Sequence, residues 1–239
     1  ILLDTELASA EKGKQYSEAL LAKQIERGRM TQEKADGLLS LITPTTDYAD
    51  LEGCDLVIEA VFESRKIKAD VTAKTEAVIP ETSVFASNTS TLPITGLATA
   101  SKRPEQFIGI HFFSPVDKMP LVEIIVGEKT NDETIARALD YVGQLRKTPI
   151  VVNDSRGFYT SRCFGTYTNE GMTLLKEGVN PALIENVARG AGMPVGPLAV
   201  TDEVAIELAY KVMKQTEADM GDKFVRPSSY EVVTKFVEE

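Results

Sequence analysis

His111 is the only histidine of the chain, and its position indicates acid–base chemistry. It ends the apolar run 107–111 and is followed by Phe112-Phe113-Ser114-Pro115. Ligands of an open α/β sheet collect beyond the carboxyl ends of its strands, and an imidazole that titrates near neutrality suits a general base. Spacing alone leaves open a histidine that is only hydrogen-bonded by backbone at a strand end.

Glu123 is a carboxylate inside the apolar run 121–126. A charge in such a strand needs a partner, and an imidazole N–H is one candidate. The pattern alone is equally compatible with the solvent face of an edge strand.

Two further polar features follow apolar runs. The residues Ser87-Asn88-Thr89-Ser90-Thr91 come after the run 83–86, where they can orient a substrate oxygen or simply build a turn. Asp4 follows the run 1–3 and suits the acidic residue that accepts ribose hydroxyls in a dinucleotide fold, although surface aspartates after strands are common. The glycine-rich phosphate loop of such a fold is expected about 20 residues before Asp4, which this sequence does not reach.

The elements that must position these residues alternate in type. Short apolar runs predict strands at 55–61, 83–86, 107–111, 121–126 and 148–152. Helical composition predicts helices at 6–29, 66–79 and 132–146, with another beginning at Thr31 as N-cap. Strands that alternate with helices indicate βαβ units and a mainly parallel sheet.

The pattern changes after Asn153. Residues 158–177, 181–190 and 202–220 are all predicted to be helical, with turns rich in glycine and proline between them. We therefore place a domain boundary near 154–157. The predicted class is α/β, with the mainly parallel sheet in residues 1–154 and an all-helical domain in residues 155–239.

Composition excludes several classes of protein. The chain has 239 residues, a net charge of −10, 43% hydrophobic and 26% charged residues, which is enough for one or two domains with a core. The acidic balance argues against a general nucleic-acid binder. No stretch approaches the roughly 18 apolar residues of a membrane span. Cys54 and Cys163 are expected to be free thiols in the reducing cytoplasm, and there are too few Cys and His ligands for a common zinc site.

Several motifs, in their order along the chain, resemble the 3-hydroxyacyl-CoA dehydrogenases. They are Leu56-Val57-Ile58-Glu59-Ala60-Val61-Phe62-Glu63, Ala86-Ser87-Asn88-Thr89-Ser90, His111-Phe112-Phe113-Ser114-Pro115-Val116, and Met119-Pro120-Leu121-Val122-Glu123 through to Gly157-Phe158-Tyr159. The form looks closest to the dehydrogenase part of bacterial multifunctional fatty-acid oxidation α subunits. The resemblance covers nearly the whole chain and implies a Rossmann-like NAD-binding domain, truncated at its N-terminus, followed by a helical domain.

The resemblance also implies roles for individual residues. His111 is expected to take the proton of the 3-hydroxyl while hydride leaves C3 for NAD, and Glu123 to orient and charge-stabilise the imidazole. Ser90 is expected to contact both cofactor and reacting oxygen. The other implied cofactor positions are Asp4, Val61, Phe62, Glu63, Lys68 and Ser114, and the other substrate positions are Ser17 and Ser161. Core packing for Val61 and Phe62, and a solvated helix face for Lys68, are the structural alternatives.

Two departures from the family pattern keep an alternative open. Ser114 and Ser161 stand where the family usually has asparagine, and serine is shorter and lacks the amide fork. A non-catalytic acyl-CoA-binding or structural relative is therefore an alternative. A different two-domain β-hydroxyacid dehydrogenase would generally use a catalytic lysine, and the pair His111 and Glu123 argues against it.

The expected activity is oxidation of L-3-hydroxyacyl-CoA to 3-ketoacyl-CoA in β-oxidation. The protein is expected to be an oligomer or part of a longer multifunctional chain, with an enoyl-CoA hydratase domain before this segment. Without the phosphate-binding helix N-terminus, residues 1–239 alone are expected to bind NAD weakly or undetectably.

Overall fold

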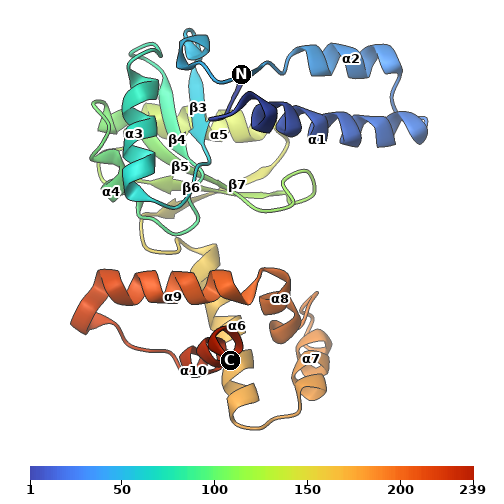
Figure 1. The fold of residues 1–239 in the computed structure, drawn as a ribbon, viewed down its shortest axis with the longest axis vertical. Helices are drawn as coiled ribbons and strands as arrows, with labels where there is room; N and C mark the ends of the chain where they lie inside the picture. Colours follow the sequence, from blue (N-terminus) through green and yellow to red (C-terminus); the bar gives the residue numbers. More distant parts are fainter. The chain divides into compact units, whose positions relative to one another are not determined.

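The computed structural model describes all residues from 1 to 239. They form two compact units (Figure 1). The first unit contains residues 1–89 and 94–151, and the second contains residues 90–93 and 152–239.

The first unit is built on two sheets. Its strands are β1 (Leu2–Leu3), β2 (Pro44–Thr45), β3 (Leu56–Glu59), β4 (Val84–Ser87), β5 (Phe107–Phe112), β6 (Leu121–Val126) and β7 (Thr148–Asn153). Strands β1 and β2 pair in parallel, and the other five form one sheet in the order β3-β4-β5-β6-β7. The pairs β3–β4 and β4–β5 are parallel, whereas β5–β6 is antiparallel. The prediction of a mainly parallel sheet is thereby confirmed.

Helices lie on both faces of the five-stranded sheet. The helices of this unit are α1 (Leu7–Glu26), α2 (Gln32–Ser40), α3 (Arg65–Glu76), α4 (Ile94–Ala98) and α5 (Asp132–Gln144), with 3-10 turns at Tyr48–Leu51 and Pro104–Gln106. Ile108 and Ile110 of β5 belong to one fully buried cluster with Ala138 and Val142 of α5. On the opposite face, a Cβ at Gly109 would come within 2.9 Å of Ile94 of α4. Successive side chains of a strand point to opposite faces, so His111 shares the face of Gly109.

Helices α1 and α2 form a hairpin and run side by side in Figure 1. The turn between them contains Gly28 in the left-handed region, with φ 66°. Thr31 begins the second helix, as predicted, because its Oγ1 accepts the Lys34 N–H at 3.3 Å.

The second unit is helical, as predicted. Its helices are α6 (Thr160–Lys176), α7 (Pro181–Gly190), α8 (Pro197–Glu203), α9 (Ile206–Met220) and α10 (Ser229–Glu238), with a 3-10 turn at Gly221–Lys223. Helices α6 and α8 pack so closely at Gly171 that there is no room for a side chain there. A Cβ at this position would lie 2.5 Å from the side chain of Pro197. No helix of either unit is long and apolar enough to cross a membrane.

The helix expected over residues 202–220 ends where predicted, but its start was wrong. The structure has two helices there, separated at Ala205, whose φ of 67° is incompatible with a continuous right-handed helix. The short helix α4 and the C-terminal helix α10 were not predicted.

Candidate active site

His111 and Glu123 are direct cross-strand neighbours in the antiparallel pair β5–β6. The His111 Nδ1 lies 2.8 Å from a Glu123 carboxylate oxygen, Oε2. The Glu123 side chain is completely buried, and that of His111 is 8% exposed. The solvent-face alternative for Glu123 is therefore wrong, and its partner is the imidazole.

This contact determines how the imidazole can react. An ionised carboxylate only accepts hydrogen bonds, so the His111 Nδ1–H donates to Glu123. Nε2 is then the nitrogen that can accept a proton from another group. The ring of Phe113 lies against the imidazole, with centroids 4.5 Å apart, and restricts its rotation. The arrangement can hold a general base in one orientation.

The same face of the sheet carries more polar side chains at the carboxyl ends of β3 and β4. Glu59 pairs with Ser87, and Ser87 pairs with Gly109, two residues before His111. Paired residues of neighbouring strands share a face, so Glu59, Ser87, His111 and Glu123 all project opposite α5. Ser87 is fully buried, and its hydroxyl donates a short hydrogen bond to Glu59 Oε1.

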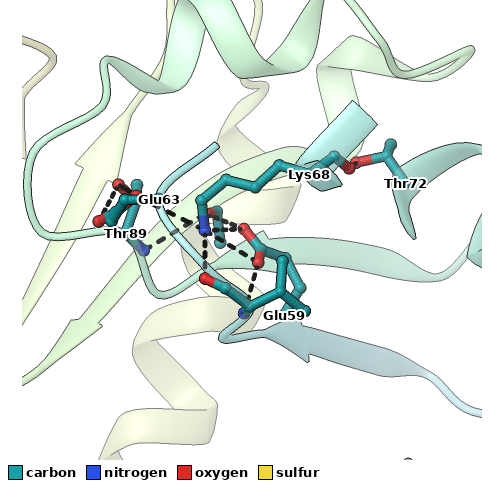
Figure 2. A network of polar contacts seen from close by, with 7 residues as sticks. Glu59, Glu63, Lys68, Thr72 and Thr89 are labelled. Carbon is teal, nitrogen blue, oxygen red and sulfur yellow. Dashed lines mark hydrogen bonds and ion pairs between the residues drawn. The ribbon is translucent and has the colours of Figure 1, made fainter. Parts of the chain in front are cut away.

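Glu59 and Lys68 form a second buried pair (Figure 2). Lys68 reaches from α3, and its Nζ lies 3.0 Å from both Glu59 carboxylate oxygens. Both side chains are only 3% exposed. The solvated-face alternative for Lys68 is therefore wrong. Sequence reasoning missed Glu59, although a carboxylate in the apolar run 55–61 is the same signal that identified Glu123.

The turn after β3 carries the other implied cofactor positions of this region. Lys68 Nζ donates to the Val61 carbonyl at 3.2 Å, and the Val61 N–H donates to Glu59 Oε2 at 3.1 Å. Phe62 is 82% exposed, so core packing does not explain it. The Glu63 carboxylate accepts the Thr89 hydroxyl at 2.9 Å.

The polar residues Asn88 and Thr89 after β4 form hydrogen bonds with other residues of the chain. The Asn88 side-chain oxygen accepts the N–H of Phe112, next to His111, at 2.9 Å, and the Asn88 N–H donates to the Glu59 carbonyl at 2.8 Å. The Thr89 N–H donates to Ser87 Oγ at 3.3 Å. Asn88 and Thr89 therefore connect the carboxyl ends of β3, β4 and β5. This is the structural role in a turn that the sequence left open for this segment. Ser90 follows them and groups with the second unit, as does Ser161 near the start of α6.

The loop after β5 is held from two sides. Tyr16 of α1 donates its hydroxyl to Asp117 at 3.1 Å, and this bond to a carboxylate raises the Tyr16 pKa. Lys147 donates to the carbonyls of Val116 and Met119 at 2.5 and 2.7 Å. The exposed Ser114 begins this loop, and the half-buried Ser17 follows Tyr16 on α1. Ser114 and Ser17, which the resemblance implies as ligand contacts, thus lie in segments of the first unit that are held by hydrogen bonds.

Asp4 lies directly after β1 and is exposed. Its Oδ1 accepts the N–H of Thr5 at 2.6 Å. An exposed carboxylate after a parallel strand can accept hydrogen bonds from hydroxyl groups such as those of a ribose. The Lys68 ammonium is already bound to the Glu59 carboxylate and to the Val61 carbonyl. No three His, Cys, Asp or Glu side chains of the chain come together as a metal-ligand set.

A mainly parallel sheet with helices on both faces, polar side chains at its strand ends and a buried histidine–carboxylate pair defines a class of α/β proteins typical of dinucleotide-dependent oxidoreductases. Family models give the particular family. Residues 1–155 match "3-hydroxyacyl-CoA dehydrogenase, NAD binding domain", and residues 157–239 match "3-hydroxyacyl-CoA dehydrogenase, C-terminal domain". The chain belongs to the 3-hydroxyacyl-CoA dehydrogenase family, and its first domain is of the NAD-binding kind.

Individual relatives agree with this assignment. The chain is 43% identical over 216 residues to the fatty acid oxidation complex subunit alpha of Shewanella amazonensis, and 42% identical to that of Shewanella loihica. Its fold is similar to (S)-3-hydroxybutyryl-CoA dehydrogenase of Ralstonia eutropha, with a TM-score of 0.91 and 33% identity, covering 99% of this chain and 83% of that one. These two Shewanella matches cover 90% of this chain but only 31% of each subunit.

Proposed function

We propose that this chain carries out NAD-dependent oxidation of L-3-hydroxyacyl-CoA to 3-ketoacyl-CoA in fatty-acid β-oxidation, as the dehydrogenase part of a longer multifunctional chain. Residues 1–154 would hold NAD and residues 155–239 would form the helical domain. Membership of the family and the similarity to fatty acid oxidation subunits support this proposal. We also propose that the protein is located in the cytoplasm, a reducing compartment in which its two free cysteines would stay reduced.

In the proposed mechanism, His111 Nε2 removes the proton from the 3-hydroxyl group. The C3–H bond breaks as a hydride leaves, and the C–O bond becomes a carbonyl. Bound NAD supplies the hydride acceptor. The protonated imidazole would be stabilised by the buried Glu123, whose carboxylate lies 2.8 Å from Nδ1. Ser90 would contact the reacting oxygen, and Asp4 the adenosine ribose.

The observation that carries the proposal is the buried pair of His111 and Glu123 at the carboxyl end of β5. The test replaces the base in the full-length protein. His111→Gln is expected to lower turnover roughly 10²–10⁴-fold, because general base catalysis contributes about that much. The assay follows NADH oxidation with acetoacetyl-CoA.

The affinity for NADH, measured by calorimetry on the same variant, serves as the control. It is expected to stay unchanged, because the proposal gives His111 no part in holding the cofactor. Near-wild-type turnover of His111→Gln would refute the mechanism.

A non-catalytic acyl-CoA-binding relative is the alternative that Ser114 and Ser161 favour. The same assay on the unmodified full-length protein separates the two. Acetoacetyl-CoA binding without any NADH oxidation would support the alternative.

A further inference from the structure

Glu59 is a buried carboxylate without a part in the proposed proton transfer. It lies at the end of β3, is 5% exposed, and accepts hydrogen bonds from three donors. These donors are the Lys68 ammonium, the Val61 N–H and the Ser87 hydroxyl. A charge removed from water in this way is costly unless every contact is satisfied, so the arrangement calls for a specific explanation.

Lys68 connects this carboxylate to the turn that follows β3. Its Nζ binds both oxygens of Glu59 and also donates to the Val61 carbonyl at 3.2 Å. The Val61 N–H donates to Glu59 Oε2 at 3.1 Å. Both backbone polar groups of Val61 are thus fixed by one buried ion pair, as Figure 2 shows for Glu59 and Lys68. The same Lys68 Nζ lies 3.7 Å from the half-exposed Glu63 carboxylate.

The pair also reaches toward His111. The Glu59 backbone carbonyl accepts the Asn88 N–H, and the Asn88 side chain accepts the Phe112 N–H. The turn at Val61 and the strand end at Phe112 therefore share one hydrogen-bonded connection. A buried ion pair generally contributes little net stability compared with apolar side chains of the same size. Its distinctive property here is that it fixes the direction of the Val61 carbonyl.

We propose that Glu59 is a positioning residue, which acts through Lys68 to hold the Val61–Glu63 turn in the shape that NAD requires. On this reading Lys68 contributes by orienting the Val61 carbonyl and not by neutralising the cofactor's phosphates. The inference rests on the proposed function, since it presupposes that this turn lines the NAD site.

The experiment compares three variants of the full-length protein. Glu59→Gln keeps the shape of the side chain and removes its charge. The double variant Glu59→Gln/Lys68→Met removes both charges, and no buried charge then lacks a partner. Lys74→Met is the matched control, because Lys74 lies on the same helix and forms an ion pair with Asp70 at 2.7 Å, but with a side chain that is 54% exposed. NADH affinity is measured by calorimetry, thermal stability by circular dichroism, and KM for NAD and kcat by steady-state kinetics.

The expected result separates positioning from stability. Glu59→Gln should weaken NADH binding roughly tenfold, the effect of one hydrogen bond to a charged group, and raise KM for NAD with less than about a threefold loss of kcat. The double variant should regain thermal stability while its NADH affinity stays weak, because the Val61 carbonyl has then lost its donor, Lys68. Lys74→Met should match the wild type.

Two results would overturn the inference. One is unchanged NADH affinity of Glu59→Gln, and the other is a double variant that recovers both stability and affinity. If Glu59→Gln does not fold, the double variant alone decides. In either case the wild-type protein still binds NADH, whereas failure of the wild type to bind NADH would refute the proposed function as well.

Discussion

Two glutamates in apolar strands, Glu59 and Glu123, are each buried and each paired, but with different partners. The partner of Glu123 is an imidazole, a ring that can both accept and donate a proton. The partner of Glu59 is an ammonium, which only donates hydrogen bonds. The first pair is therefore suited to moving a proton and the second to holding backbone in place.

The Glu123→Gln variant tests the first of these pairs. Gln can still accept the Nδ1–H bond of His111 but carries no charge to stabilise the imidazolium. We expect turnover of the full-length protein to fall roughly 10²-fold with little change in NADH affinity. The matched control is Glu128→Gln, which alters an exposed glutamate just beyond the end of β6. Equal turnover in the two variants would argue against a catalytic role for Glu123.

The elements of the first unit were largely predictable, because each strand is a short apolar run between polar segments. Strand β6 has the predicted bounds, and β3, β4, β5 and β7 differ from the predicted bounds by one or two residues. The contact of His111 with Glu123 was proposed from a general rule on buried charges. What the sequence could not show is the antiparallel register that places them opposite each other, since register depends on neighbouring strands.

The elements that were missed have physical reasons. The break at Ala205 falls at a residue with high helix propensity, so only tertiary packing reveals it. Helix α4, with five residues, is too short for a periodic pattern. The Glu59–Lys68 pair joins a strand to the following helix and depends on the direction of both.

Ala205 provides a test at the level of elements. A non-glycine residue with φ 67° is strained, and glycine, which has no Cβ, is less strained at a positive φ. Ala205→Gly is therefore expected to raise the free energy of unfolding by roughly 0.5–1 kcal/mol, measured by urea denaturation. Ala209→Gly, inside α9, is the control and should lower it by about the same amount. A loss of stability in Ala205→Gly would show that α8 and α9 are continuous in solution.

For the whole molecule, acid stability of the second unit is expected to depend on Glu217. Its pKa is lowered by a hydrogen bond from Tyr230 and by Arg226, whose guanidinium binds the same carboxylate. A lowered folded pKa means that the stabilisation is fully present above the ordinary value of 4.5 and is lost as the pH falls through the folded pKa.

The variant Glu217→Gln should therefore be less stable than the wild type at neutral pH, and the difference should shrink as the pH falls below the ordinary carboxyl value of 4.5. Thermal melting followed by circular dichroism across this range measures it. Glu170→Gln, an exposed change on α6, is the control. A stability difference that is constant with pH would contradict the prediction.

The antiparallel pairing of β5 with β6 determines which residues between them can change without moving His111 and Glu123. The spacing of His111 and Glu123 is set by the hydrogen-bonded ladder between the two strands, and not by the connecting residues 113–120. Changes in that connection can therefore alter the loop without changing the contact between His111 and Glu123. Residues 113–120 can therefore be replaced or lengthened by protein engineering while the two strands keep His111 and Glu123 in register.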